Sequence, residues 1–228
     1  MTIAYLLAGA GAATSRRSVR YHRACVAATG KSRPTLAYVG AASNDDPTFA
    51  RRIGELVFGA TARVISVELT RKGTRTSTLR AQLADADLMF FTGGDVEHGM
   101  ALIADRGLAP YIRELAAGGT IVEGISAGAI MVGRHWVRFP EHGEPEVFDC
   151  LGIVPASFDT HGEGDGWSEL RALARLARDE RLVYGIPSDG CAYWDGSRVR
   201  ALGSPLARFR CGDRARRLAD GRIALIAT

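Results

Sequence analysis

Runs of apolar residues alternate with amphipathic stretches along the first part of the chain. The apolar runs lie at 3–8, 35–39, 62–69, 88–91 and 120–122, and the helical stretches at 17–29, 48–58, 77–86 and, in two pieces separated by Arg106-Gly107, between 95 and 117. Strands that are apolar on both faces are covered on both faces, and strands that alternate with helices form right-handed βαβ units. The pattern predicts an α/β fold, a three-layer sandwich with helices on both faces of a mostly parallel sheet.

The second part of the chain is less regular. Residues 135–149 are rich in charge, histidine and proline, and we interpret them as an excursion of loops or a hairpin. The pattern then predicts a strand at 156–160, a helix at 167–178 capped by Asp165, a strand at 182–186, a hairpin of 191–194 with 199–202, and a last strand at 223–227. The pattern also predicts a small antiparallel extension near the C-terminus, where the hairpin lies. Because no linker, repeat or low-complexity segment interrupts the chain, we expect a single domain over 1–228.

The composition excludes several classes of protein. Of 228 residues, 46% are hydrophobic and 24% charged, and no apolar run approaches the length that crosses a membrane. No basic segment precedes the first apolar run, so we expect no signal peptide and a cytoplasmic location. The net charge is +4, but no aromatic residues interleave with the scattered arginines, which argues against a nucleic-acid surface.

The four cysteines form no recognised metal or redox motif. Cys25, Cys150, Cys191 and Cys211 include no Cys-x-x-Cys pair, and no His/Cys cluster has the spacing of a zinc site. We therefore expect free thiols, no metal and no organic cofactor.

The most informative motif is Gly124-Ile125-Ser126-Ala127-Gly128, which directly follows an apolar run. A serine between two glycines at a strand end is typical of a nucleophile elbow, a tight strand-to-helix turn that exposes the hydroxyl. The free N–H groups and the positive dipole end of the next helix would face the reacting oxygen. With 27 glycines in the chain the motif alone is not specific, and the alternative is a glycine-rich turn whose serine caps a helix.

Two further features are expected at the same edge of the sheet. Gly93-Gly94 ends an apolar run, and a backbone N–H there, with that of Ala127, would form an oxyanion hole. His161 ends the strand 156–160 and is the best placed of five histidines to act as a base toward Ser126. Of the other four, His22 is expected in solvent on a charged helix face, His98 is expected to pack near the edge, and His135 and His142 lie in the 135–149 excursion.

Four segments resemble, in order and spacing, the dipeptidase E/cyanophycinase family of serine peptidases. They are Phe91-Thr92-Gly93-Gly94-Asp95, Gly124-Ile125-Ser126-Ala127-Gly128-Ala129, Asp159-Thr160-His161 and Gly185-Ile186-Pro187. The resemblance runs from Ile3 to about Gly203 and implies a fold related to the class I glutamine amidotransferases. It implies Ser126 as nucleophile, His161 as base, the amides of Gly94 and Ala127 as oxyanion hole, and Gly93 at the substrate. It also implies a small peptide substrate, since family members cleave Asp-Xaa dipeptides or the β-aspartyl-arginine links of cyanophycin.

The chain departs from the family at the third member of the triad. The family has an acid after the Gly-Ile-Pro-like strand end, whereas here Ser188 takes that position and Asp189 follows one residue later. We expect Asp189 to orient His161, with Glu163, Asp159 and Glu141 as alternatives.

A second departure concerns the loop after His161, Gly162-Glu163-Gly164-Asp165-Gly166. The family has a Phe here, followed by arginines that recognise an acidic side chain. Arg171, and beside it Arg175, could clamp a substrate carboxylate, with a solvated helix face as the alternative. Because the loop is acidic, a basic N-terminal group or basic side chain is a second candidate for what the site selects.

The sequence thus predicts a serine peptidase that hydrolyses dipeptides or short peptides, Asp-Xaa among the candidates, through an acyl-enzyme on Ser126. Two other classes stay open: a catalytically impaired relative that acts as a binding or regulatory module, and an esterase- or amidase-type acyl hydrolase. The expected partner is a small peptide, not nucleic acid or membrane. A homo-oligomer is compatible with the sequence, and residues 135–149 have two candidate roles, a lid or a subunit contact.

Overall fold

The computed structural model describes residues 1–9, 16–54, 58–59, 61–212 and 216–218. In chain order the elements are β1 (Ala4–Leu7), α1 (Arg16–Ala28), β2 (Thr35–Val39), the 3₁₀ turn η1 (Ala41–Ser43), α2 (Pro47–Ile53), β3 (Arg63–Val67), α3 (Thr76–Ala84), β4 (Leu88–Phe91), α4 (Val96–Asp105), α5 (Ala109–Gly118), β5 (Ile121–Ile125), α6 (Ala127–Val132), β6 (His135–Arg138), β7 (Glu146–Asp149), β8 (Ser157–Thr160), α7 (Ser168–Leu176), β9 (Leu182–Ile186), β10 (Cys191–Trp194), β11 (Val199–Leu202), β12 (Ala207–Arg210) and β13 (Arg216–Arg217). None of the described helices is long and apolar enough to span a lipid bilayer.

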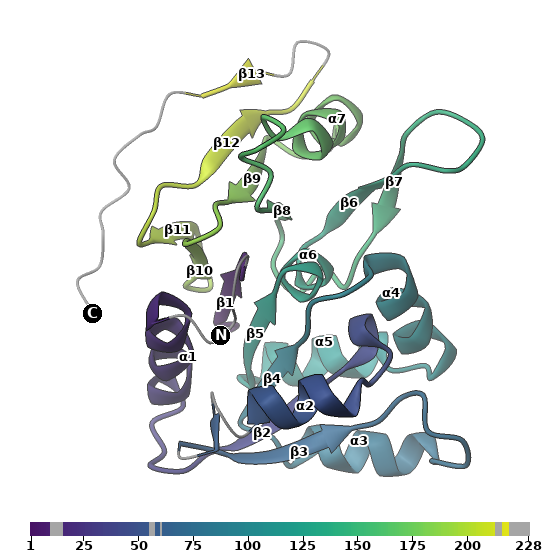
Figure 1. Cartoon of the computed structure of the whole chain (residues 1–228), viewed down its shortest axis with the longest axis vertical. Coiled ribbons are helices and arrows are strands. Elements are labelled where there is room, and N and C mark those ends of the chain that lie inside the picture. Colours follow the sequence, from purple (N-terminus) through teal and green to yellow (C-terminus); the bar gives the residue numbers. More distant parts are fainter. Residues whose placement is uncertain (10–15, 55–57, 60, 213–215, 219–228) are drawn as a thin grey trace.

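A seven-stranded sheet in the order β11-β10-β1-β5-β4-β2-β3 forms the centre of the fold (Figure 1). The neighbouring strands β1, β5, β4, β2 and β3 are parallel to one another. By contrast, β10 pairs antiparallel with both β1 and β11. The strands β1, β2, β4 and β5 are buried along their whole length. The mostly parallel sheet and the 191–194/199–202 hairpin are therefore confirmed.

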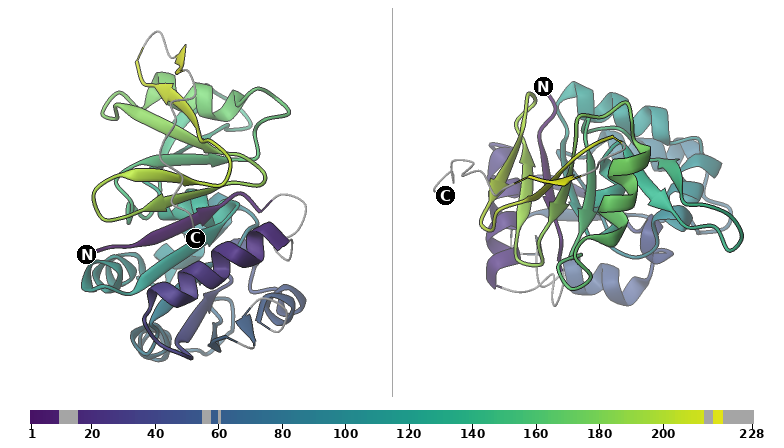
Figure 2. Two further views of the ribbon diagram at one scale, coloured as in Figure 1. Left: turned by 90° about the vertical axis from the view of Figure 1, so that its left-hand side faces the viewer. Right: turned by 90° about the horizontal axis from the view of Figure 1, so that it is seen from above.

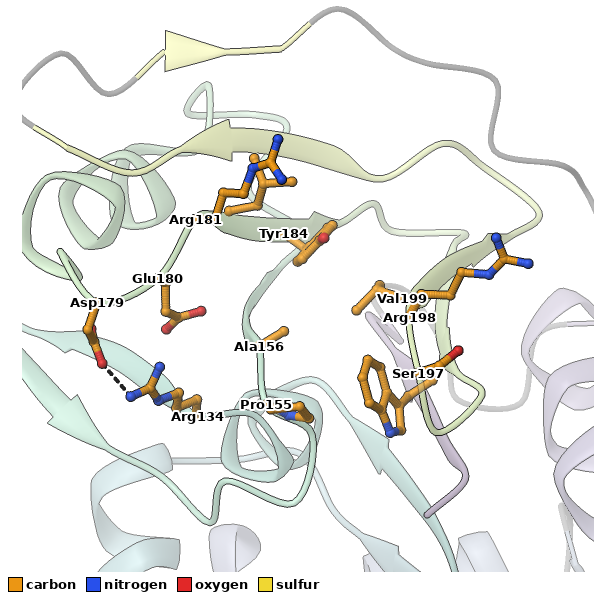
Figure 3. A pocket seen from close by; sticks show the side chains of 12 residues that line it. Arg134, Pro155, Ala156, Asp179, Glu180, Arg181, Tyr184, Ser197, Arg198 and Val199 are labelled. Atoms are coloured by element: carbon orange, nitrogen blue, oxygen red, sulfur yellow. Dashed lines mark ion pairs between the residues drawn. The ribbon is translucent and has the colours of Figure 1, made fainter. Parts of the chain in front are cut away.

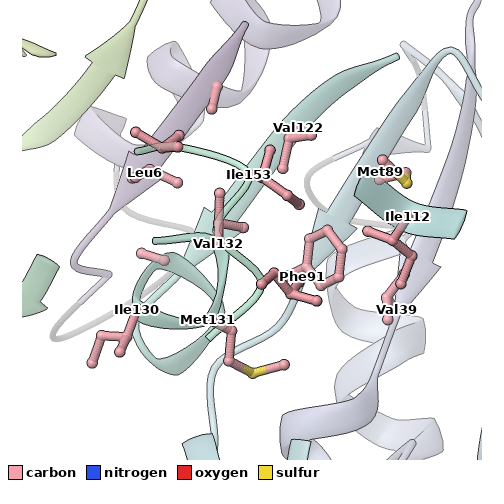
Figure 4. Close-up of a cluster of buried hydrophobic side chains, with 14 of the residues drawn as sticks. Leu6, Val39, Met89, Phe91, Ile112, Val122, Ile130, Met131, Val132 and Ile153 are labelled. Carbon is pink, nitrogen blue, oxygen red and sulfur yellow. The ribbon is translucent and has the colours of Figure 1, made fainter. Parts of the chain in front are cut away.

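Helices cover both faces of this sheet (Figure 2). On one face, α1 and α2 contribute Tyr21, Cys25 and Ile53 to the core. On the other face, α3 to α6 enclose a larger core that includes Phe91 and Ile112 (Figure 4). The predicted three-layer α/β sandwich is confirmed.

A second sheet, β13-β12-β9-β8, lies beside the first and is packed by α7 (Figure 1). The strands β8 and β9 are parallel, and β12 pairs antiparallel with β9. Phe158 of β8 and Ile186 of β9 belong to the larger core of the first sheet, so the two sheets share one apolar interior. The strand β12 was not predicted, and the predicted strand 223–227 lies outside the described residues.

The 135–149 excursion is a two-stranded antiparallel hairpin of β6 and β7. Phe139 and Val147 on it are exposed apolar residues. Its predicted form as a hairpin is confirmed, while its roles as lid or subunit contact stay predictions.

The expectation that His22 is solvated is wrong. His22 is 1% exposed, and its Nδ1 contacts Oε1 of Glu123, which is 0% exposed. The helix α1 turns Ser18, Tyr21, His22, Cys25 and Val26 inward, which is the three-and-four spacing of a buried helix face. The charged residues next to His22 in the sequence lie on other faces of the helix. Their charge therefore does not indicate that His22 is exposed.

Candidate active site

Ser126 sits at a strained turn between β5 and α6. Its backbone has φ 53° and ψ −121°, a region that non-glycine residues rarely occupy and that costs of order 1–3 kcal/mol. The turn is held by the Ser126 N–H donating to the Leu7 carbonyl at 2.8 Å and by the Ala129 N–H donating back to the Ser126 carbonyl at 2.8 Å. This is the geometry of a nucleophile elbow, with the serine at a strand's carboxyl end and directly before a helix.

The two glycines of the motif are required by close backbone packing. A Cβ on Gly124 would lie 2.6 Å from the Gly128 carbonyl oxygen, and a Cβ on Gly128 would lie 2.2 Å from the Phe91 carbonyl oxygen. Both distances are far inside van der Waals contact, and the neighbours are backbone atoms that cannot turn away. The helix α6 therefore lies directly against the ends of β5 and β4, which presses the turn outward.

The Gly93-Gly94 loop lies against Ser126. A Cβ on Gly93 would be 3.2 Å from Cβ of Ser126, and Gly94 has φ +139° with the position of its Cβ only 1.9 Å from the Ala42 carbonyl oxygen. The Asp95 N–H donates to the same carbonyl at 2.8 Å, which ties this loop to η1. The Ala127 N–H is the first of α6, and the first N–H groups of a helix have no acceptor within the helix. The backbone at Gly93 and the start of α6 thus lie next to Ser126, while an oxyanion hole formed by the N–H groups of Gly94 and Ala127 stays a prediction.

His161 reaches Ser126 from the second sheet. Its Nε2 lies 3.1 Å from Oγ of Ser126, within hydrogen-bond reach. The residue follows β8 with φ 46°, and its N–H donates to the Ile186 carbonyl of β9 at 3.0 Å. The following loop is tied by the Trp167 N–H, which donates to the Gly162 carbonyl at 2.7 Å. The structure therefore brings together the serine and histidine that the sequence singled out.

The carboxylates proposed to orient His161 contact other groups. Oδ1 of Asp189 accepts a hydrogen bond from Ser204 Oγ at 2.6 Å, and Oε1 of Glu163 accepts one from the Ser188 N–H at 2.6 Å. Oδ1 of Asp159 accepts from the Thr160 N–H at 2.7 Å. Glu141 is exposed on the β6–β7 hairpin. Within the described part of the chain, no side-chain acceptor is recorded at Nδ1 of His161, so the orienting acid stays a prediction.

A pocket of about 300 Å³ opens beside Ser126 and His161. Gly94, Ala127 and Trp136 line it, together with carboxylates from α7 and β8. The most buried of these is Asp159, whose pKa is raised to about 7, chiefly by burial and further by the negative charges of Glu169 and Asp165. A hydroxyl–imidazole pair beside a pocket suits attack on a substrate carbonyl carbon.

Neither Arg171 nor Arg175 is among the described residues that line this pocket. Both are exposed on α7. The guanidinium of Arg171 lies close to Gly166, where a Cβ would come within 3.1 Å of it. The predicted role of Arg171 in substrate binding therefore requires a substrate that extends past the 162–166 loop, and it stays a prediction.

The cysteines are poor candidates for a nucleophile. All four are free thiols, and Cys25 and Cys191 are fully buried. Burial raises the pKa of Cys150 to about 12 and that of Cys211 to about 11. These thiols stay protonated near neutral pH, and the thiolate is the reactive form. Among the described residues, no three His, Cys, Asp or Glu side chains are grouped so that they could hold a metal ion.

A second pocket, of about 440 Å³, lies between the two sheets (Figure 3). Arg134 and Asp179 form an ion pair on one side of it, and Ser197 and Arg198 line the other. Ser197 is the one serine among its described lining residues, and its Oγ donates to Oδ1 of Asp195 at 2.6 Å. Because its described lining residues include no histidine, this pocket offers no base for that hydroxyl, and the smaller pocket is the candidate active site.

Comparison with known proteins finds relatives over most of the chain. Residues 5–201 match the sequence model of peptidase family S51. A cyanophycinase from Trichormus variabilis is 29% identical over 133 residues, which cover 55% of this chain and 45% of the relative, so the match spans less than half the length of that protein. The uncharacterized peptidase YgaJ of Bacillus subtilis is 24% identical over 70% of this chain and 67% of its own length.

Solved structures share the fold at low sequence identity. A peptidase from an acI-B1 actinobacterium matches with a TM-score of 0.72 at 14% identity, covering 97% of this chain and 96% of that one. A protein described as a candidate peptidase E from Listeria monocytogenes matches with a TM-score of 0.66 at 16% identity, covering 88% and 98%. The chain therefore shares its fold with the actinobacterial protein over nearly its whole length.

Proposed function

Because this chain belongs to peptidase family S51, we propose that it is a serine peptidase that hydrolyses dipeptides or short peptides through an acyl-enzyme on Ser126. The single observation that carries the proposal is the 3.1 Å separation of Ser126 Oγ and His161 Nε2 at a nucleophile elbow. A serine hydroxyl needs a base at this distance to become nucleophilic near neutral pH.

In the proposed reaction, Nε2 of His161 takes the proton of Ser126 Oγ as the oxygen attacks the scissile carbonyl carbon. The negative charge that develops on the carbonyl oxygen is stabilised by the N–H groups of Gly94 and Ala127, and one such donor contributes about 3–4 kcal/mol. The imidazolium then gives its proton to the leaving amine as the C–N bond breaks. Water attacks the acyl-enzyme with His161 again as base, which releases the acid product and restores Ser126.

Asp189 is proposed to orient the imidazole during this cycle. Its Oδ1 accepts from Ser204, and because a carboxylate has further acceptor sites, the proposal requires it to accept an additional bond from Nδ1 of His161 when substrate binds. Catalytic hydrogen bonds are often long or absent without substrate and form in the complex.

The size of the pocket supports a small substrate. Its volume of about 300 Å³ is at the lower end for small-molecule sites, which suits a dipeptide or one end of a short peptide. The cyanophycinase relatives match this chain over less than half of their length, so the substrate that their name implies is not carried over.

A second candidate function is a binding or regulatory module that keeps the fold and has lost turnover. The observation that favours it is the absence, within the described residues, of a carboxylate at Nδ1 of His161. An esterase-type acyl hydrolase would use the same serine and histidine, so only the substrate separates it from a peptidase.

Hydrolysis of a dipeptide panel, measured beside a p-nitrophenyl ester panel, tests the proposal. We expect turnover of dipeptides by the wild-type protein and none above background by Ser126→Ala. Turnover of esters alone would assign the esterase class. Failure on both panels by a folded protein, with peptide binding retained, would assign the binding module.

A further inference from the structure

The pocket beside Ser126 is lined by four carboxylates. They are Asp95, Asp159, Asp165 and Glu169, and its described lining residues include neither lysine nor arginine. A substrate that places its carbonyl at Ser126 must put a neighbouring group into this pocket. The charges here therefore bear directly on what the enzyme accepts.

Two of the four carboxylates accept hydrogen bonds from groups near the start of a helix. Oδ1 of Asp95 accepts the His98 N–H of α4 at 2.8 Å. Oδ1 of Asp165 accepts the Trp167 N–H at 2.9 Å and its Oδ2 accepts Ser168 Oγ at 2.5 Å, bonds that lower the pKa of Asp165. Asp95 caps α4 and offsets the positive end of that helix, while Asp165 holds the turn that leads into α7.

The other two carboxylates, Asp159 and Glu169, face the pocket from neighbouring elements. Asp159 is on β8, two residues before His161, and is only 6% exposed. Glu169 is half-buried in the first turn of α7, and its Oε2 accepts from Nε1 of Trp136 at 3.2 Å. The charge of Glu169 contributes to raising the pKa of Asp159, after burial itself, so the two groups interact.

This part of the pocket is thus a negative, partly desolvated region with an aromatic ring beside it. A carboxylate from a substrate would meet repulsion there, because like charges in low dielectric are costly. A cation would interact favourably with both carboxylates and with the indole of Trp136. The exposed guanidinium of Arg171 lies beside Gly166 and does not line the pocket.

We propose that Asp159 and Glu169 bind a cationic group of the substrate residue whose carbonyl is attacked by Ser126. The group is an ammonium or a guanidinium, supplied by a lysine- or arginine-type side chain or by the free N-terminal amine. This inference rests on the proposed peptidase function and narrows its substrate class away from acidic peptides. Asp159 and Glu169 act here as specificity-determining residues.

Peptides that differ only in one charge test the inference. The peptides differ only in the residue whose carbonyl is attacked and share the same leaving amine. At that residue, lysine is compared with norleucine and arginine with citrulline, and an aspartate peptide is included. Every peptide is measured with a free and with an acetylated N-terminus, which separates a side-chain cation from the N-terminal amine. We expect kcat/KM to be about tenfold to hundredfold higher for the charged member of the deciding pair.

Glu169→Gln removes the charge and keeps an acceptor for Trp136, so it is expected to abolish most of this preference, mainly through KM. Glu97→Gln is the matched control, because Glu97 also stands in the first turn of a helix, α4, but faces Arg138 at 3.7 Å. It is expected to leave the preference unchanged. Asp159→Asn is a second, independent variant that is also expected to lose the preference for the charged peptide.

Calorimetric binding of the same peptides, as amides, to Ser126→Ala separates the inference from the proposed function. A cation preference in binding with no hydrolysis by the wild type would retain the inference and reject the peptidase. Hydrolysis with equal or better use of norleucine, citrulline or aspartate peptides would overturn the inference and leave the peptidase standing. A preference that survives in both Glu169→Gln and Asp159→Asn would likewise overturn it.

Discussion

Nε2 of His161 lies 3.1 Å from Oγ of Ser126, although the two residues are 35 positions apart and follow strands of different sheets. Ser126 follows β5 of the central sheet, and His161 follows β8 of the second sheet. Each has a positive φ, 53° and 46°, so each backbone is held in a conformation that its own side chain disfavours. The alignment of the pair therefore depends on how the two sheets pack.

The orienting acid is tested by comparing Asp189→Asn with Ser204→Ala. If Asp189 orients His161 during turnover, Asp189→Asn lowers kcat by up to about four decades, and Ser204→Ala leaves kcat within about twofold. If Asp189 only anchors its loop, with Ser204 as one of its partners, both variants lose stability and keep kcat. Steady-state kinetics with thermal unfolding of each variant decides, and full activity of Asp189→Asn would move the assignment to Glu163 or Asp159.

The packing of the elbow predicts opposite effects of two glycine substitutions. Gly128→Ala places a Cβ 2.2 Å from the Phe91 carbonyl oxygen, whereas a Cβ on Gly118 of α5 meets no atom within 4 Å. We expect Gly128→Ala to lower the free energy of unfolding by about 3 kcal/mol or more. Gly118→Ala should raise it slightly, by up to about 1 kcal/mol, because alanine is favoured over glycine in helices. Urea denaturation measures both, and a neutral Gly128→Ala would contradict the described turn.

Asp159 makes the stability of the fold depend on pH. Its pKa is raised from 3.8 to about 7 by burial and by the facing charges of Glu169 and Asp165. Between about pH 4 and 7 the native state holds a proton that the unfolded chain has released, so the stability contributed by this group falls as pH rises. Asp159→Asn should therefore raise the free energy of unfolding at about pH 8, by about 1–4 kcal/mol, and change it little at about pH 4.

Urea denaturation of wild type and Asp159→Asn at both pH values checks this. The difference between them should appear only as pH rises through the window. If Asp159→Asn destabilises the protein at the higher pH, the ionised carboxylate does not destabilise the native state, and the account of its raised pKa is contradicted.

The buried pair of His22 on α1 and Glu123 on β5 is expected to stabilise the fold next to the elbow. Glu123 is fully buried on β5, three residues before Ser126, and its Oε1 contacts Nδ1 of His22. Glu123→Ala leaves His22 buried without this partner and should cost about 3–5 kcal/mol. Asp85→Ala, which breaks the exposed Arg63–Asp85 pair, is the control and should cost less than about 1 kcal/mol. Similar costs for the two variants, measured by urea denaturation, would contradict the buried pairing.

The local patterns of the sequence were sufficient for the central sheet and the elbow. Apolar runs such as 35–39 and 88–91 mark strands buried on both faces, and the spacing of Gly124, Ser126 and Gly128 describes a turn made within a few residues. The position of His161 at the end of a strand was also local information. These features are decided by near neighbours in the chain, which a single sequence displays.

The features that were missed depend on contacts between distant segments. β12 alternates buried Ala207 and Phe209 with Arg208 and Arg210, a period-two signal that was present but weak beside the arginines. The burial of His22 follows from its place beside Tyr21 and Cys25 on one helix face, and its partner is a glutamate within an apolar strand. The contacts of Asp189 and Glu163 depend on the path of two loops, which no spacing in the sequence defines.

Covalent labelling by a fluorophosphonate tests the central claim most directly, since the probe reacts with a serine hydroxyl only when that hydroxyl is activated by its surroundings. We predict that the wild-type protein is labelled, that mass spectrometry places the adduct on Ser126, and that Ser126→Ala and His161→Ala are not labelled. A folded wild-type protein that is not labelled, or that is labelled at another residue, would contradict the assignment of Ser126 as the nucleophile.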